Sequence, residues 1–201
     1  LTVKENEFLA ITGRSGAGKS TFMYQLSVLD EPTEGTIIIG GVNVTALSEI
    51  ERTDFRLNTL GYVFQDYALV PDLNVRENIM LPLLMRKVPW NEAQTVSDLA
   101  LNEVGLIEKH NNFPGQLSGG EQQRVAIARA VAGKPKILFA DEPTANLDSR
   151  SGDAVIDMIT RLHREFGQTV VMVTHEKEYA SNCTRLIEMG DGIIISDTER
   201  S

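Results

Sequence analysis

Short apolar runs alternate along this chain with segments in which apolar residues recur every three or four positions. The runs predict buried strands at 8–12, 36–41, 60–65, 136–141, 169–174, 185–189 and 192–196. The periodic segments predict helices at about 19–28, 48–58, 75–106 and 149–166, and a further helix directly after Gly120. In the first helix, Phe22, Leu26 and Leu29 are expected to form the apolar face. Strands that alternate with helices predict an α/β fold with a mainly parallel sheet.

The helical pattern between residues 75 and 115 interrupts this alternation. We therefore expect one domain, 1–201, in which 75–115 form a helical subdomain. The remaining residues, 1–74 and 116–201, are expected to form the sheet-containing core together with an antiparallel β subdomain.

Composition narrows the class of protein. The 201 residues suffice for one domain with a sizeable core. With 28 acidic and 19 basic residues the net charge is -9, which argues against a nucleic-acid partner. Cys183 is the only cysteine, so the chain can form no internal disulfide, as suits a reducing cytosol. Neither Cys183 nor the three histidines show the spacing of a zinc site.

A glycine-rich stretch follows the first predicted strand. "GRSGAGKS", from Gly13 to Ser20, fits the pattern G-x-x-x-x-G-K-[ST] between a strand and a helix. In such a loop the backbone N–H groups and the helix N-terminus cradle phosphate oxygens. We expect Lys19 to reach the β and γ phosphates, Ser20 to coordinate Mg²⁺, and Thr21 to donate to the α phosphate. The predicted nucleotide-binding residues are Gly13, Arg14, Ser15, Gly16, Ala17, Gly18, Lys19, Ser20 and Thr21.

Two carboxylates end the predicted strand 136–141. Asp141 is suited to hold Mg²⁺ through its water shell, and Glu142, which points the opposite way, to polarise the water that attacks the γ phosphate. The alternative is that both are solvated residues at the turn before Pro143. The phosphate loop favours the first interpretation.

A second donor-rich loop meets a helix start in "QLSGGEQQRVAIARA", from Gln116 to Ala130. Ser118 is a good N-cap residue, and capping does not exclude contact with a ligand. "LSGGE", Leu117 to Glu121, matches the signature motif of ATP-binding-cassette (ABC) ATPases. Gln65 follows its strand where that family has its Q-loop glutamine.

Two more motifs appear in the same order: "ANLD", 145–148, is similar to the D-loop, and His175 after "VMVT" matches the switch histidine. From its first strand to its last, the chain resembles the nucleotide-binding domain of an ABC transporter. The resemblance implies a P-loop NTPase fold with a RecA-like core and an Mg²⁺-dependent ATPase.

The resemblance also implies a site shared between two copies paired head to tail. Each ATP would lie between one chain's phosphate loop and the signature loop of the other, Ser118, Gly119, Gly120 and Glu121. The implied catalytic residues are Lys19, Gln65, Glu142 and His175, with Asp148 in the D-loop. The implied Mg²⁺ ligands are Ser20, Gln65 and Asp141, partly through water.

Further stretches are similar to one subgroup, which includes lipoprotein-releasing, macrolide-exporting and division-associated ATPases. They are 61–84, "DEPTANLDSRSGDAVIDMI" and "VMVTHEKEYA"; "RLIEMGDG" is similar to the lipoprotein-releasing branch. This implies transmembrane permease subunits as partners and a cytoplasmic location on the inner face of the cell membrane. The alternative is a hydrolysing regulatory ATPase that acts on a cell-division or cell-wall membrane partner.

Two expectations concern the periphery of the site. Asp66, Tyr67, Leu69 and Val70 beside Gln65 are equally well explained as a docking surface for a membrane subunit and as core contacts. Only 12 residues precede Gly13, and none of them fits the aromatic residue that stacks on adenine in this family. We therefore expect an N-terminally truncated chain with an unpaired edge in its β subdomain. Loss of the stacking would weaken ATP binding by about 1–3 kcal/mol.

Overall fold

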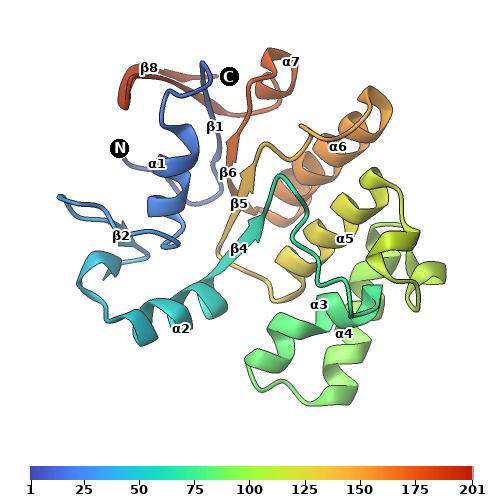
Figure 1. Ribbon diagram of the computed structural model, residues 1–201. Helices are drawn as coiled ribbons and strands as arrows, with labels where there is room; N and C mark the ends of the chain where they lie inside the picture. Colours follow the sequence, from blue (N-terminus) through green and yellow to red (C-terminus); the bar gives the residue numbers. More distant parts are fainter. Residues whose placement is uncertain (201) are drawn as a thin grey trace.

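A six-stranded sheet forms the centre of the computed structural model, which describes residues 1–200 (Figure 1). In spatial order its strands are β4 (Leu60–Val63), β5 (Ile137–Asp141), β6 (Thr169–Val173), β1 (Phe8–Gly13), β7 (Arg185–Gly190) and β8 (Ile193–Glu199). The strands from β4 to β7 in that order are parallel, and β8 pairs antiparallel with β7. The predicted fold class is confirmed.

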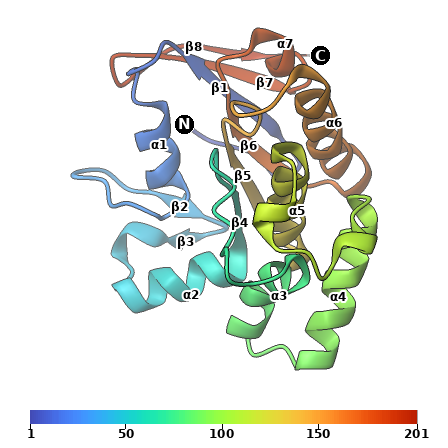
Figure 2. The ribbon, with the colours of Figure 1, turned by 45° about the vertical axis from the view of Figure 1, so that its right-hand side comes forward.

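Helices cover both faces of this sheet (Figures 1 and 2). The helices are α1 (Lys19–Leu26), α2 (Glu49–Thr59), α3 (Val75–Met85), α4 (Trp90–Glu103), α5 (Gly119–Ala132), α6 (Ser149–Phe166) and α7 (Lys177–Ala180), with 3₁₀ turns at Val44–Ala46, Ile107–Lys109 and Pro114–Gln116. Successive residues of a strand point to opposite faces. Phe8 and Ala10 therefore pack with α5 and α6, whereas Leu9 and Ile11 pack with α1.

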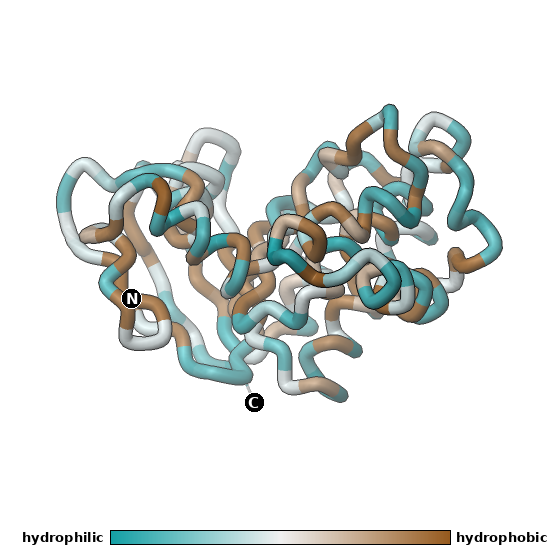
Figure 3. Tube along the Cα trace, turned by 90° about the horizontal axis from the view of Figure 1, so that it is seen from below, coloured by the Kyte–Doolittle hydropathy of each residue, from teal (hydrophilic) through white to brown (hydrophobic). Residues whose placement is uncertain are grey.

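The helical block consists of two helices, although the periodicity predicted one continuous run over 75–106. Helix α3 ends at Met85, Lys87 takes a left-handed conformation (φ 63°), and Pro89 is the N-cap of α4. Both helices pack on α5: Val75 of α3 and Leu101 of α4 belong to the same apolar cluster as α5 residues. Figure 3 shows two lobes joined in the middle, each with hydrophobic segments.

The first helix ends earlier than predicted. It stops at Leu26, and Val28 adopts a left-handed backbone (φ 61°). Phe22 and Leu26 pack against the core as expected, but Leu29 lies beyond the helix and is 43% exposed. Its assignment to the apolar face was wrong.

Two strands are also clearly shorter than predicted. The run 36–41 contributes only β2 (Ile38–Ile39), which pairs with β3 (Val42–Asn43). Gly40 and Gly41 between them both have positive φ, as a tight hairpin turn requires. Strand β4 ends at Val63, so the two residues up to Gln65 belong to a loop.

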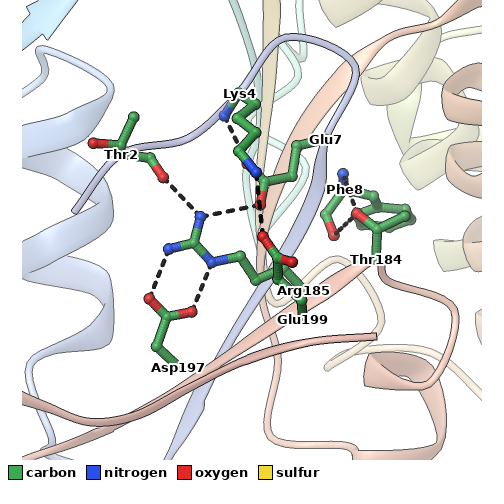
Figure 4. Close-up of polar contacts among 8 residues, drawn as sticks. All are labelled: Thr2, Lys4, Glu7, Phe8, Thr184, Arg185, Asp197 and Glu199. Carbon is green, nitrogen blue, oxygen red and sulfur yellow. Dashed lines mark hydrogen bonds and ion pairs between the residues drawn. The ribbon is translucent and has the colours of Figure 1, made fainter. Parts of the chain in front are cut away.

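An ion-pair network ties the N-terminal segment to β7 and β8 (Figure 4). The Arg185 guanidinium donates two hydrogen bonds of 2.6 Å to Asp197, one of 2.7 Å to the Thr2 carbonyl and one of 3.1 Å to Glu7. Such a bidentate pair fixes orientation as well as position. Among residues 1–200, no helix combines the length and apolar character that crossing a bilayer requires.

Candidate active site

Glycines shape the loop between β1 and α1. Gly13, Gly16 and Gly18 have φ angles of 149°, 79° and 88°, which residues with a Cβ rarely adopt. A Cβ on Gly13 would lie 2.2 Å from the Met189 carbonyl oxygen, so only glycine fits. Gly18 is the N-cap of α1 and supplies no side-chain cap. The first N–H groups of this helix therefore remain available to an anion.

Lys19 lies under this loop rather than in solvent. Its side chain is buried, and Nζ donates to the Gly13 carbonyl at 3.0 Å and to the Arg14 carbonyl at 3.1 Å. An ammonium group has three donors. Lys19 can therefore brace the loop and still donate to a phosphate.

Eight of the nine predicted nucleotide-binding residues line a cleft of about 1200 Å³. The ninth, Ala17, is buried beneath the loop. Glu142 and His175 form another part of the cleft wall. The structure therefore brings the glycine-rich loop and the predicted catalytic pair together.

Asp141 lies at the end of β5 and is 5% exposed. Burial, and after it the charge of Glu142, raises the pKa of Asp141, whereas hydrogen bonds from Tyr62 and Ser20 lower it. Its Oδ1 is buried and, within residues 1–200, has no hydrogen-bond partner. Such an oxygen requires an unseen partner, and a metal ion or a metal-bound water is one.

Mg²⁺ fits this place. The Ser20 hydroxyl and the Asp141 carboxylate are the hard oxygen ligands that Mg²⁺ prefers. In the part of the chain that the structure describes, no three His, Cys, Asp or Glu side chains gather around a common point. A few protein ligands completed by water and phosphate are the usual arrangement for Mg²⁺.

Glu142 is held in an unusual backbone conformation. It has φ 43°, and its N–H donates to the Val173 carbonyl at 3.0 Å. Its Oε2 lies 3.3 Å from Nδ1 of His175, whose side chain is 57% exposed. Left-handed residues other than glycine are costly and concentrate at functional sites. A carboxylate and an imidazole at hydrogen-bonding distance can together hold and orient a water molecule.

Gln65 is exposed and does not line the cleft. Its carbonyl accepts a 3.0 Å hydrogen bond from Nδ2 of Asn146. Of its neighbours, Leu69 packs on the α3–α4–α5 cluster, and the Val70 backbone exchanges two hydrogen bonds with the buried Asn78 side chain. Leu69 and Val70 are thus core contacts in part, whereas Asp66 is exposed.

The signature loop is capped within its own chain. Oγ of Ser118 accepts from the Glu121 N–H at 3.3 Å, and Oε2 of Glu121 accepts from the Ser118 N–H at 2.9 Å. Lys109 forms an ion pair with Glu121. None of residues 118–121 lines the cleft of the chain that carries them. Asp148 likewise caps α6, accepting hydrogen bonds from the backbone and hydroxyl of Ser151.

The sequence profile of the family described as "ABC transporter" matches residues 1–145. The chain belongs to the ABC transporter family. It is 46% identical over its full length to the lipoprotein-releasing system ATP-binding protein LolD of Aquifex aeolicus, of which it covers 89%. To LolD of Koribacter versatilis it is 43% identical, over 96% of this chain and 86% of that protein. It is also 46% identical to the macrolide export ATP-binding/permease protein MacB of Chlorobium luteolum, over 100% of this chain and 30% of that protein.

A solved structure agrees with this assignment. The ATP-binding cassette MJ0796, described as a dimeric post-hydrolysis state bound to ADP and Pi, superposes with a TM-score of 0.93 at 39% identity. The superposition covers 100% of this chain and 89% of that one. The protein is therefore an ABC-type ATP-binding protein of the ABC ATPase family, homologous to LolD and MacB.

Some residues of this ABC site could not be found from sequence motifs. Tyr62 pairs in register with Phe139, so both lie on the face of the sheet to which Asp141 points. The Tyr62 hydroxyl is 3.5 Å from Asp141 Oδ2. Strand alternation would have identified it once the pairing of β4 with β5 was known. Glu188 reaches the cleft because it pairs with Thr12, a contact between distant segments.

Proposed function

We propose that this ABC ATPase hydrolyses ATP at a site shared by two copies paired head to tail. One observation carries the proposal: the cleft holds the phosphate loop, Glu142 and His175, whereas the signature loop lies outside it. The signature helix nevertheless retains free first-turn donors at Gly119 and Gly120, which suit an anion. The relative MJ0796 is dimeric with ADP and Pi. A second chain would bring its Ser118 loop to the γ phosphate.

Each residue then has a defined task. Lys19 and the loop N–H groups bind the phosphates, and Asp141 with Ser20 holds Mg²⁺. Gln65, which lies outside the cleft in this structure, would reach the Mg²⁺ when residues 75–115 turn. Bound Mg²⁺ supplies positive charge that stabilises the transferring phosphoryl group. Glu142 accepts a proton from the attacking water, and His175 orients that water or the γ phosphate. Asp148 keeps the start of α6 in place beside the second chain.

We further propose that the cycle drives transmembrane subunits in lipoprotein release or macrolide-type export, with this chain on the inner face of the membrane. The relatives LolD and MacB support this choice. An apolar groove between α2 and α3 offers a docking place next to the Gln65 loop; it is lined in part by Leu57, Leu81, Pro82 and Met85. Residues 75–115 would turn as a subdomain when a membrane subunit engages there.

The decisive experiment uses Glu142→Gln, which removes the proposed base and should trap the ATP-bound pair. Size-exclusion chromatography with light scattering should show a monomer alone and a dimer with ATP and Mg²⁺. Adding Ser118→Arg should abolish the dimer. ATP binding is measured on the same samples, and tight binding without any dimer would contradict the shared site.

A further inference from the structure

The loop that follows Gln65 has a strained backbone. Tyr67 and Ala68 are consecutive left-handed residues, with φ angles of 64° and 47°. Neither is glycine, and in this region the Cβ approaches the following carbonyl oxygen, which disfavours the conformation. The Ala68 N–H donates to the Asp66 carbonyl at 2.7 Å, so the chain reverses sharply here. Such a turn persists only where its surroundings enforce it.

Arg129 enforces the turn from the signature helix α5. Its Nη2 donates to the Tyr67 carbonyl at 2.8 Å, and its Nη1 donates to the Ala68 carbonyl. The guanidinium is a planar fork of donors, which matches two successive carbonyl groups. Arg129 is partly buried and lies ten residues after Gly119 in the same helix.

Asn146 holds the same loop from the other side. Its Nδ2 donates to the Gln65 carbonyl at 3.0 Å, and its own carbonyl accepts from the Tyr67 hydroxyl at 3.4 Å. A Cβ on Gly119 would lie 2.8 Å from that hydroxyl oxygen, so the signature loop also meets this point. Three loops with proposed roles at the nucleotide therefore share one junction.

We propose that Arg129 and Asn146 are positioning residues that together fix the backbone of the Gln65 loop. The inference rests on the proposed role of Gln65 at Mg²⁺ and the attacking water. Arg129 keeps residues 67 and 68 in their left-handed turn, and Asn146 ties residue 65 to the loop of Asp148. Neither side chain lines the nucleotide cleft. Loss of either should therefore displace Gln65 without changing how ATP binds in the absence of Mg²⁺.

Because the turn is strained, a second substitution in the turn should partly reverse the effect of losing Arg129. Glycine adopts positive φ without a steric cost. Arg129→Met should release the turn, and adding Ala68→Gly should restore part of the function because the turn then needs less support. Ala68→Gly alone should change little.

The test measures three quantities for each variant: the Mg²⁺ concentration at half-maximal ATPase rate, the ATP affinity in EDTA, and amide hydrogen exchange over residues 64–70. Arg129→Met and Asn146→Ala should raise the Mg²⁺ midpoint and the exchange rates of Tyr67 and Ala68 by about tenfold. ATP affinity in EDTA should stay unchanged. Asn146 is exposed, so Asn146→Ala should fold. It therefore still tests the proposal if Arg129→Met does not fold.

Arg56→Met is the matched control, because Arg56 donates at 2.7 Å to the carbonyl of another left-handed residue, Val28. An equal Mg²⁺ shift in this control would overturn the inference, since general destabilisation would then explain the effect. Gln65→Ala separates the two proposals. If it raises the Mg²⁺ midpoint while Arg129→Met and Asn146→Ala do not, the positioning role is refuted and the proposed function stands. If it leaves the midpoint unchanged, the role of Gln65 itself fails, and the inference with it.

Discussion

Helices α1 and α5 both begin in glycine-rich loops, but side chains cap the first turn of α5 and not that of α1. The N-cap of α1 is Gly18, which has no side chain, and the first turn of α1 contains no acidic residue. The N-cap of α5 is Ser118, which forms a complete capping box with Glu121. One helix start is left open, and the other is closed by its own chain.

This difference in capping agrees with the way in which each loop would bind phosphate in the proposed head-to-tail dimer. An uncapped helix start depends on its ligand to satisfy its N–H groups. The α1 loop faces its own cleft and is braced by Lys19. A capped start is ordered before any ligand arrives, which reduces the entropy lost when a second chain docks. In α5 the cap takes up the Glu121 N–H, and the N–H groups of Gly119 and Gly120 remain for a ligand.

The largest expected effect is at the open helix start. Lys19→Met should weaken ATP binding about 100-fold, because charge-assisted hydrogen bonds to phosphate are lost. Titration with a fluorescent ATP analogue measures the effect. Lys136→Met changes an exposed lysine outside this cleft and should bind as the unmodified protein does. If the two variants bound ATP equally well, the start of α1 would not be the primary phosphate site.

A smaller and different effect is expected at the closed helix start. Ser118→Ala should cost about 1 kcal/mol of stability through the lost cap. It should leave ATP affinity of the monomer unchanged but lower the ATPase rate about tenfold or more, because a donor to the γ phosphate is lost across the interface. Urea denaturation and steady-state ATPase assays measure the two effects.

Helix α2 offers a matched control for this change. Ser48 and Glu51 form the same capping box at its start, away from the cleft. Ser48→Ala should lose similar stability and keep its ATPase rate. If both variants lost activity equally, the loss would reflect stability, and the special role of Ser118 would be refuted.

The order of elements and the nucleotide cleft followed from sequence because their signals are local. An apolar run can be recognised without knowing which elements pack against it. The geometry of the glycine-rich loop is determined by the residues of the loop itself. Helix α6 has the bounds that the periodicity predicted; in the structure Asp148 caps its start and Gly167 ends it in a left-handed conformation. Glu142 and His175 follow β5 and β6, two neighbouring parallel strands, so they meet at one edge of the sheet.

Features set by distant partners could not be predicted in this way. Helix α1 ends early because Val28 turns left-handed, with its carbonyl bound by Arg56 from α2. No glycine or asparagine marks that turn, nor the one at Tyr67 and Ala68. In both places an arginine from another helix stabilises a conformation that local propensity disfavours. The contact of Tyr62 with Asp141 similarly depends on the register of two separate strands.

The smallest expected effect is a pH dependence confined to the closed helix start. Hydrogen bonds from Lys109 and then from the Ser118 backbone lower the pKa of Glu121 in the folded protein. Its contribution to stability is therefore present above the unfolded pKa of about 4.3 and is lost as the pH falls through the lower, folded value. Glu121→Gln keeps a hydrogen-bonding side chain but removes the charge. We expect it to lower the free energy of unfolding by about 0.3–1 kcal/mol at pH 7.

Urea unfolding of both proteins from pH 7 to pH 3 measures this difference. It should shrink below pH 4 as the Glu121 carboxylate is protonated and the two side chains become alike in charge. Glu51→Gln on α2 is the comparison: hydrogen bonds from Ser48 lower the pKa of Glu51 too, but no lysine is among the causes. A smaller pH-dependent difference is therefore expected there. A difference for Glu121→Gln that grows on acidification would mean that the Glu121 charge destabilises α5, and the contrast between an open and a closed helix start would then rest on Ser118 alone.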